Sequence, residues 1–138
     1  MKLILMVNLQ NKNMTEIKKA QIGIEDFAKI ELKVGEIKEA HLVDGADKLY
    51  RFVVDVGEKN ETGECIYRTI LSGIREFFPD KDIFVGKKVC VVANLLPRKM
   101  RGFESNGMLL FAGGGDNSLG KLFSVAPDFE APVGTIIR

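Results

Sequence analysis

The 138-residue chain contains no tryptophan, one histidine and two cysteines. His41 adjoins apolar Leu42 and Val43, and no Gly-x-Ser-x-Gly turn accompanies it, so a hydrolase triad is not expected. Cys65 and Cys90 are too far apart for a CxxC metal site and too few for a disulfide framework. Cys90 stands among valines, as a buried thiol would. We therefore expect a protein that is not an enzyme, holds no metal or cofactor, and resides in the reducing cytoplasm.

Long hydrophobic runs are also absent. The apolar stretch Met1–Val7 is far too short to span a membrane, and polar residues follow it where a signal peptide would have a small-residue cleavage site. Met14 is a plausible alternative start, so residues 1–13 receive no functional weight. No membrane partner is expected.

Charge of one sign is not in excess, because 20 Lys and Arg oppose 19 Asp and Glu and the net charge is +1. Net charge therefore gives no argument for binding to polyanions in general. Five basic residues with no acidic one nevertheless lie between Gly86 and Phe103: Lys87, Lys88, Arg98, Lys99 and Arg101. A local positive patch on an otherwise balanced surface suits a protein that binds a phosphate backbone.

The alternation of apolar and polar residues predicts a mainly β protein. Leu32 and Val34 alternate with Glu31 and Lys33, which is the period of a half-buried strand. The apolar phase shifts after Gly35, where we expect a bulge or a sharp bend. Further strands are expected near 52–57, 65–71, 88–93 and 108–112.

The segment between the third and fourth expected strands has helical spacing over 72–82. Ser72 is a possible N-cap, and Pro79 limits this segment to a short helix or a turn. Three strands, a short helix and two strands is the order of the oligonucleotide/oligosaccharide-binding (OB) barrel. We thus predict an all-β, five-stranded OB barrel with small α content and extra C-terminal strands within 122–137.

One motif resembles a phosphate-binding loop. Residues 115–121 fit the spacing G-x-x-x-x-G-K, but Leu122 stands where Ser or Thr would hold magnesium. The residues that follow are strand-like, so no helix N-terminus is expected there. A flexible glycine-rich hairpin explains the motif better. This motif is the only feature of the sequence that favours an enzyme.

Several separate motifs resemble the tRNA-binding domain family. They are Asp26–Gly35, Ala46–Leu49, Ser72–Ile74, Val92–Leu95 and Ser105–Leu110. That domain is found appended to methionyl-tRNA synthetases, in synthetase-associated cytokine precursors and as stand-alone tRNA-binding proteins. A related chaperone subfamily usually departs at the Ser-Gly-Ile and Ser-x-Gly-Met segments, and both are intact here.

The resemblance implies an OB domain over 22–138, preceded by an extension over 1–21. It also implies a homodimer that grips the folded body of tRNA with little regard for base sequence. The chain then acts alone or as a detached, β-subunit-like part of methionyl-tRNA synthetase. Few aromatic residues lie near the basic loop, which suits recognition of a folded RNA better than stacking of a single strand.

The candidate tRNA-binding residues lie in or near these motifs: Lys33, Asn94, Arg98, Lys99, Arg101, Ser105 and Met108. The three basic residues of 98–101 would contact phosphate oxygens, and Lys33 would add a contact from the polar side of the first strand. Asn94 either reads a 2′-hydroxyl or base edge or caps the end of the fourth strand. Ser105 and Met108 either touch RNA or form a tight turn and a core position.

Two functions from different classes remain open. The first is a non-catalytic, structure-specific tRNA-binding protein associated with a synthetase. The alternative is a chaperone-like or protein-interaction OB module whose ligand is polypeptide. Phosphate binding weakens steeply as salt rises, whereas apolar peptide binding does not, so salt dependence separates them.

Overall fold

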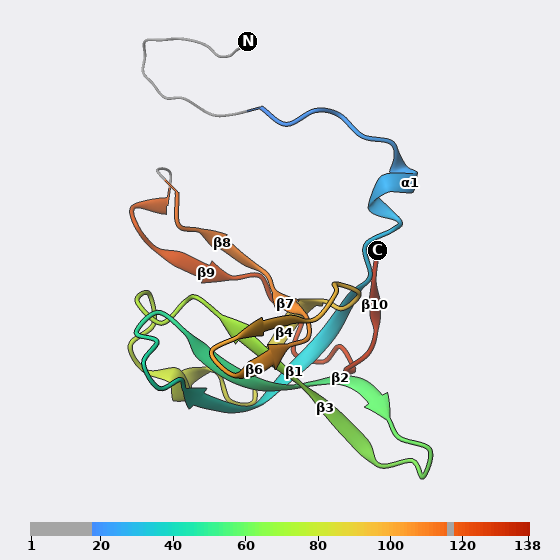
Figure 1. The fold of residues 1–138 in the computed structure, drawn as a ribbon. Helices are drawn as coiled ribbons and strands as arrows, with labels where there is room; N and C mark the ends of the chain where they lie inside the picture. The colour runs from blue at the N-terminus through green and yellow to red at the C-terminus, as the bar shows by residue number, and fades with distance from the viewer. Residues whose placement is uncertain (1–17, 116–117) are drawn as a thin grey trace, which may run out of the picture.

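A computed structural model describes residues 18–115 and 118–138 of the chain, so the expectations for residues 1–13 fall outside it. The main sheet consists of β1 (Leu32–Leu42), β2 (Tyr50–Lys59), β3 (Cys65–Ser72), β4 (Lys88–Val92), β7 (Met108–Leu109) and β10 (Ile136–Ile137). Its order is β3-β2-β1-β4-β7, and β10 pairs with the start of β1 (Figure 1). The all-β prediction and its strand order are confirmed.

Two hairpins extend from this sheet. One is formed by β5 (Arg98–Met100) and β6 (Phe103–Ser105), and the other by β8 (Phe111–Gly113) and β9 (Leu122–Ser124). The helices are a four-residue α1 (Ile24–Phe27) and a four-residue 3-10 helix η1 (Lys81–Phe84). Within 18–115 and 118–138, none of the helices has the length and apolar composition needed to cross a bilayer.

The sheet curls because the two halves of β1 pair with different long strands, β4 and β2. Its first half, Leu32 to Glu36, pairs with β4, and its second half, Glu36 to Leu42, pairs with β2. The two edges of the curled sheet then approach each other, and the backbone N–H of Asn106 donates to the carbonyl of Thr69 at 2.8 Å. β1 is thus one long strand with partners on both sides.

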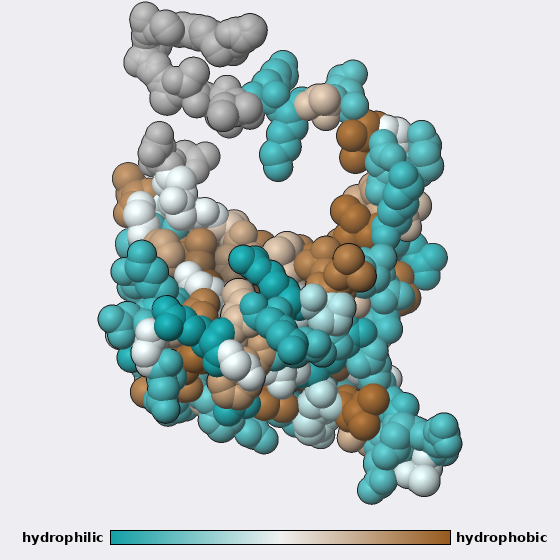
Figure 2. All heavy atoms as spheres, in the orientation of Figure 1, coloured by the Kyte–Doolittle hydropathy of each residue, from teal (hydrophilic) through white to brown (hydrophobic). Residues whose placement is uncertain are grey.

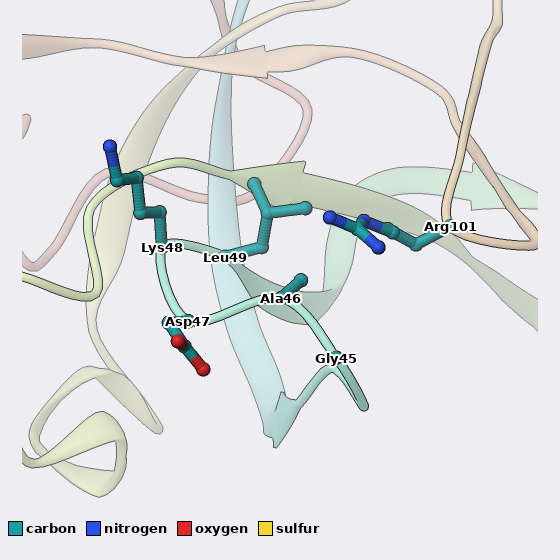
Figure 3. Close-up of a pocket in the computed structure, with 6 residues that line it drawn as sticks. All are labelled: Gly45, Ala46, Asp47, Lys48, Leu49 and Arg101. Carbon is teal, nitrogen blue, oxygen red and sulfur yellow. The ribbon is translucent and has the colours of Figure 1, made fainter.

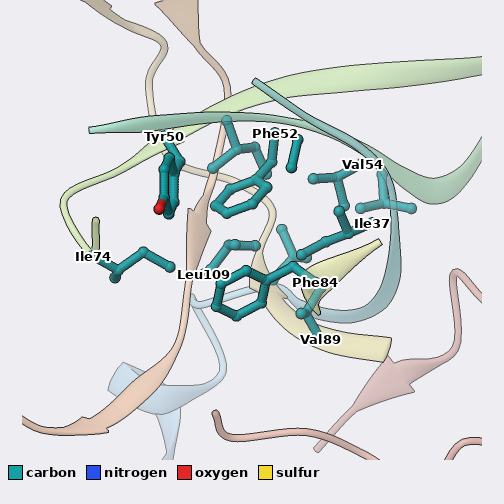
Figure 4. Close-up of a cluster of buried hydrophobic side chains, with 12 residues drawn as sticks. Ile37, Tyr50, Phe52, Val54, Ile74, Phe84, Val89 and Leu109 are labelled. Carbon is teal, nitrogen blue, oxygen red and sulfur yellow. The ribbon is translucent and has the colours of Figure 1, made fainter. Parts of the chain in front are cut away.

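The core lies inside this curl (Figure 4). Phe52, Val54 and Val56 alternate along β2 and are each 0% exposed, as expected for a strand with one buried face. Phe84 of η1 packs its ring edge-to-face on Phe52, with centroids 5.4 Å apart, so the 3-10 helix closes one side of the cluster. Burial of each such side chain stabilises the fold by roughly 1.5–3 kcal/mol.

The helical prediction over 72–82 is corrected in detail. Ser72 is the last residue of β3 and caps no helix. Residues Phe77 and Phe78 both bond back to the carbonyl of Ile74, but Pro79 has no N–H to continue the turn. The 3-10 helix starts only afterwards, where Asp80 caps it by accepting from the Asp82 amide at 3.0 Å.

The expected bulge at Gly35 lies elsewhere, between Ile37 and Glu39. Gly35 instead faces the core, where an added Cβ would lie 2.8 Å from Val91 Cγ2. The absence of a side chain therefore allows β1 to approach β4 closely. Lys33, two residues earlier, faces the same way. Lys33, which the sequence pattern placed on the polar side of this strand, therefore shares a face with core positions.

Candidate nucleic-acid interface

The basic segment after β4 is an ordered hairpin and not an irregular loop. Its turn consists of Arg101 and Gly102, whose φ angles are +51° and +84°. Two successive left-handed residues are typical of the tight type I′ turn, whose twist matches that of the flanking strands. The strands pair Arg98 with Ser105 and Lys99 with Glu104. Sequence reasoning missed the hairpin because its turn is Arg-Gly and not the common Asn-Gly or Asp-Gly.

The hairpin is held on the outer side of the sheet by one apolar contact and one cation–π contact. Met100 packs against a small cluster that contains Val43, Ala46 and Leu71. Phe103 offers its ring to the guanidinium of Arg51, which lies 4.7 Å from the ring centroid. The charged side chains are left in solvent, and Arg98, Lys99 and Arg101 are all exposed. Figure 2 shows hydrophilic residues gathered over this part of the surface.

The tip of the hairpin forms one wall of an open pocket of about 280 Å³ (Figure 3). The rest of the wall is the β1–β2 turn, Gly45 to Leu49. Arg101 points from the hairpin toward Leu49, and Lys48 extends from the other side of that leucine. The loops after the first and fourth strands of an OB barrel are its usual ligand-binding loops. Here Lys48 and Arg101, one cation from each of those two loops, line one pocket together with Leu49 and Asp47.

The segment from Ser105 to Gly107 is anchored to β3. Ser105 is 5% exposed, and its hydroxyl oxygen accepts from the Leu71 amide at 3.0 Å. Gly107 has a φ of +134°, and an added Cβ would lie 3.0 Å from Ile70 Cδ1. Both residues therefore have a structural role. Met108 follows with 45% of its surface exposed, so the prediction's alternative of a core methionine is wrong.

Asn94 acts as a clamp at the end of β4. Its side-chain oxygen accepts from the Glu31 amide at 2.9 Å, and its amide nitrogen donates to the Lys29 carbonyl at 2.7 Å. The side chain thus continues the β1–β4 ladder beyond its last backbone pair. Of the two roles that the sequence left open, this geometry supports the strand cap.

Lys33 lies apart from Met108. In the pairing of β1 with β4 it is opposite Val91, which faces the core, whereas Met108 is opposite Val92 on the other face. The pKa of Glu58 of β2 is lowered by its hydrogen bond and ion pair with Arg68 of β3, and the positive charge of Lys33 helps to lower it. The structure therefore divides the seven candidate residues between the hairpin, its base, and the inner face of β1.

Arg68 was missed by the sequence reasoning and is central to the base of the hairpin. It forms a two-pronged ion pair with Glu58, with Nε to Oε1 at 3.0 Å and Nη2 to Oε2 at 2.6 Å. The Arg68 hydrogen bond lowers the pKa of Glu58 from its usual range, and the carboxylate raises the pKa of Arg68 in turn. The pair is thus fully charged at neutral pH. Its arginine is also bonded to backbone carbonyls, which no sequence motif reveals.

The five-residue basic run is split in space. Lys88 lies at the far end of β4, where its amine donates to the carbonyls of Phe129 and Ala131 and lies over the Phe129 ring. It therefore holds the C-terminal segment in place. Lys87 precedes it at that same end. Only Arg98, Lys99 and Arg101 form the exposed basic group of the hairpin.

Among residues 18–115 and 118–138 no His, Cys, Asp and Glu cluster could hold a metal ion. The segment that follows the glycine-rich 115–121 motif is strand β9 and not a helix. The hairpin interpretation of that motif is confirmed for the residues that the structure describes, since Gly114 bonds to Lys121 across it.

The family is decided by a comparison along the whole chain. A family model described as "Putative tRNA binding domain" matches residues 32–135. The chain belongs to this tRNA-binding domain family. The matched region begins at β1 and ends just before β10, so it includes the rest of the curled sheet, both hairpins and the candidate residues.

The curated proteins similar to this chain include methionine–tRNA ligases. That of Enterococcus faecalis is 46% identical over 127 residues, which cover 92% of this chain but 18% of the ligase. That of Flavobacterium johnsoniae is 42% identical over 131 residues, covering 95% of this chain and 17% of the ligase. The chain thus spans under a fifth of the length of these relatives, and the match is to their tRNA-binding domain.

Solved structures agree with this tRNA-binding domain assignment. A methionyl-tRNA-synthetase-related protein from Pyrococcus horikoshii has a TM-score of 0.74 and 32% identity, covering 87% of this chain and 100% of that one. The CsaA chaperone protein from Picrophilus torridus has a TM-score of 0.69 and 28% identity, covering 86% and 100%. The tRNA-binding domain and a chaperone therefore share this fold.

Proposed function

We propose that this chain is a non-catalytic tRNA-binding protein that recognises folded tRNA through shape and phosphate contacts. It raises the local tRNA concentration for methionyl-tRNA synthetase, either as a separate protein or as a detached part of that enzyme, in the cytoplasm. The observation that carries this proposal is the basic hairpin. Arg98, Lys99 and Arg101 are exposed on a hairpin that the apolar packing of Met100 and the cation–π contact of Phe103 hold against the barrel.

The pairing of β5 with β6 and the packing of the hairpin on the barrel support binding to a folded RNA. A pre-formed row of cations loses little conformational entropy when it meets a backbone of fixed shape. Arg98 and Arg101 offer planar forks that match phosphate oxygens. Met108, 45% exposed at the hairpin base, supplies an apolar surface for a ribose or a base. Lys33 stays a candidate contact from the inner face, and Asn94 and Ser105 serve by positioning the backbone around them.

A competition titration tests this function. Labelled bulk tRNA is titrated with the protein, and unlabelled tRNA, linear single-stranded RNA and duplex DNA compete in turn. Because the hairpin carries no aromatic row for stacking, folded tRNA should compete best and all tRNA identities should compete alike. Equal competition by linear RNA or duplex DNA would refute shape recognition.

A homodimer is the second part of the proposal. Apolar side chains are exposed along the N-terminal segment and at the adjoining β4–β5 connection, including Ile24 at 77% and Leu96 at 90%. Asn94 ties the two segments together by bonding Lys29 and Glu31. Figure 2 shows hydrophobic residues on this side of the molecule. Sedimentation equilibrium should give twice the chain mass, and Ile24→Asp together with Leu96→Asp should give the monomer.

The alternative function is a polypeptide-binding, chaperone-like module. It is favoured by the likeness to the CsaA chaperone protein of Picrophilus torridus and by the same exposed apolar side chains. Suppression of aggregation of an unfolded client that persists at high salt, together with no preference for tRNA, would support it. Binding to tRNA that weakens steeply with salt supports the first proposal instead.

A further inference from the structure

Arg68 holds both ends of the segment that carries the basic hairpin. Its Nη1 donates to the carbonyl of Ala93 at 2.6 Å and approaches the carbonyl of Asn106 at 3.5 Å. The chain leaves the barrel after Ala93 and returns to it at Asn106. One nitrogen atom therefore joins the departure point of the hairpin to its return point.

The rest of the guanidinium is fixed so that this nitrogen has one position. Nε and Nη2 form the two-pronged ion pair with Glu58, and the Arg68 side chain is only 12% exposed. A planar guanidinium whose other edge is clamped by a carboxylate has little freedom to rotate. The direction of Nη1 is thus set by Glu58, which lies across the β2–β3 pair.

The same ion pair removes Arg68 from direct contact with RNA. Its charge is matched by Glu58, and one guanidinium edge already faces that carboxylate. The remaining nitrogen serves the backbone carbonyls. An arginine whose donors are engaged in this way is poorly suited to bind a phosphate, in contrast with the exposed arginines of the hairpin.

We infer that Arg68 is a positioning residue for tRNA binding: clamped by Glu58, it fixes the base of the 94–105 excursion and so the direction of the basic hairpin. This inference rests on the proposed function, because the hairpin is the element that binds phosphate. It assigns a role to a residue that itself touches no RNA. Without the clamp, the hairpin keeps its charges but loses its fixed orientation. The conformational entropy lost when the hairpin is ordered on binding then reduces the affinity for tRNA.

The test compares Arg68→Lys and Arg68→Met with the wild-type protein. Lysine keeps the charge but lacks the fork, so it cannot satisfy Glu58 and the two carbonyls together. Both variants should bind tRNA about tenfold more weakly at fixed salt, because ordering the hairpin opposes binding. The slope of log affinity against log salt should stay unchanged, since no phosphate contact is lost.

A second readout needs no RNA. Amide hydrogen exchange across 98–106 should accelerate in both variants while exchange in β2 stays slow. The matched control is Lys88→Met, because Lys88 also holds two backbone carbonyls, those of Phe129 and Ala131, at the opposite end of β4. That variant should leave both tRNA affinity and hairpin exchange unaltered.

Three results would overturn the inference. They are wild-type affinity in folded Arg68 variants, unaltered hairpin exchange, and a salt slope that falls by about one, which would make Arg68 itself a phosphate contact. If the wild-type protein fails to bind tRNA, the proposed function fails, but the exchange experiment still decides whether Arg68 orders the hairpin.

Discussion

Removing the charge of the hairpin gives the sharpest quantitative prediction. The triple variant Arg98→Ala, Lys99→Ala, Arg101→Ala deletes three exposed cations and leaves Met100 and Phe103 to hold the hairpin in place. Exposed substitutions of this kind change the free energy of unfolding by roughly 0.5 kcal/mol or less each. The fold should therefore persist, and any loss of binding reports on the charges.

The magnitude follows from counterion release. Each phosphate contact contributes about 0.9 to the slope of log affinity against log salt, so three contacts contribute about 2.7. Over a fourfold rise in salt, the wild-type protein should then lose about 40-fold more affinity than the triple variant. Fluorescence anisotropy titrations with labelled tRNA at about 50 mM and about 200 mM salt measure this difference in affinity loss directly.

The control variant removes the same charge elsewhere. Lys81, Lys87 and Lys121 lie outside the hairpin, so their replacement by alanine should reduce the slope far less. A triple hairpin variant whose affinity falls in constant proportion to the wild type at every salt concentration would refute the reasoning. So would equal slopes for the hairpin variant and its control.

An opposite change on the same hairpin should have the opposite effect. Glu104 is paired with Lys99 across the two strands and sets a negative charge beside the phosphate-binding group. Glu104→Gln should raise tRNA affinity severalfold at low salt and less at high salt, because the repulsion it removes is screened. Weaker binding by this variant would show that Glu104 serves another role.

Three further predictions concern the hairpin base. Ser105→Ala should lower the free energy of unfolding by about 1–3 kcal/mol in urea titrations, because the buried Leu71 amide loses its acceptor; an unchanged midpoint would contradict this. Met108→Ala should weaken tRNA binding a fewfold with an unchanged melting temperature, since the side chain is 45% exposed; a large loss of stability would mean a core role. The depressed pKa of Glu58 means that its ion pair stabilises the fold fully above the ordinary value of 4.5 and progressively less as pH falls below it. Urea unfolding of the wild type and Glu58→Gln should therefore converge between neutral and acidic pH, and a constant difference would contradict the ion pair.

The sequence sufficed for the strand order because alternation is a local property. The alternating residues of β2, Phe52, Val54 and Val56, are also the ones that form the core. The pattern was less informative on β1 because both of its faces are covered: Gly35 lies against Val91 inside, and Val34 on the opposite face is only 2% exposed. A strand buried on both sides has no polar side for the pattern to reveal.

The sequence predicted the location of the candidate site, but not which of its residues bind RNA and which position the backbone. Charge clustering correctly identified Arg98, Lys99 and Arg101 as exposed residues on one element. The structural roles of Asn94 and Ser105 depend on backbone amides far away in the sequence. Because every residue type except proline has such an amide, no sequence motif marks these partners. Arg68 was overlooked for the same reason.

The measurement that tests the central claim most directly is nuclear magnetic resonance mapping of the isotope-labelled protein on addition of tRNA. The claim is that one surface, the β5–β6 hairpin with Met108 at its base, binds the RNA. Chemical shifts should change across 98–103 and at Met108, with smaller changes in the β1–β2 turn beside Arg101. Changes confined to α1 and the exposed apolar residues near it, with the hairpin unaffected, would contradict the account.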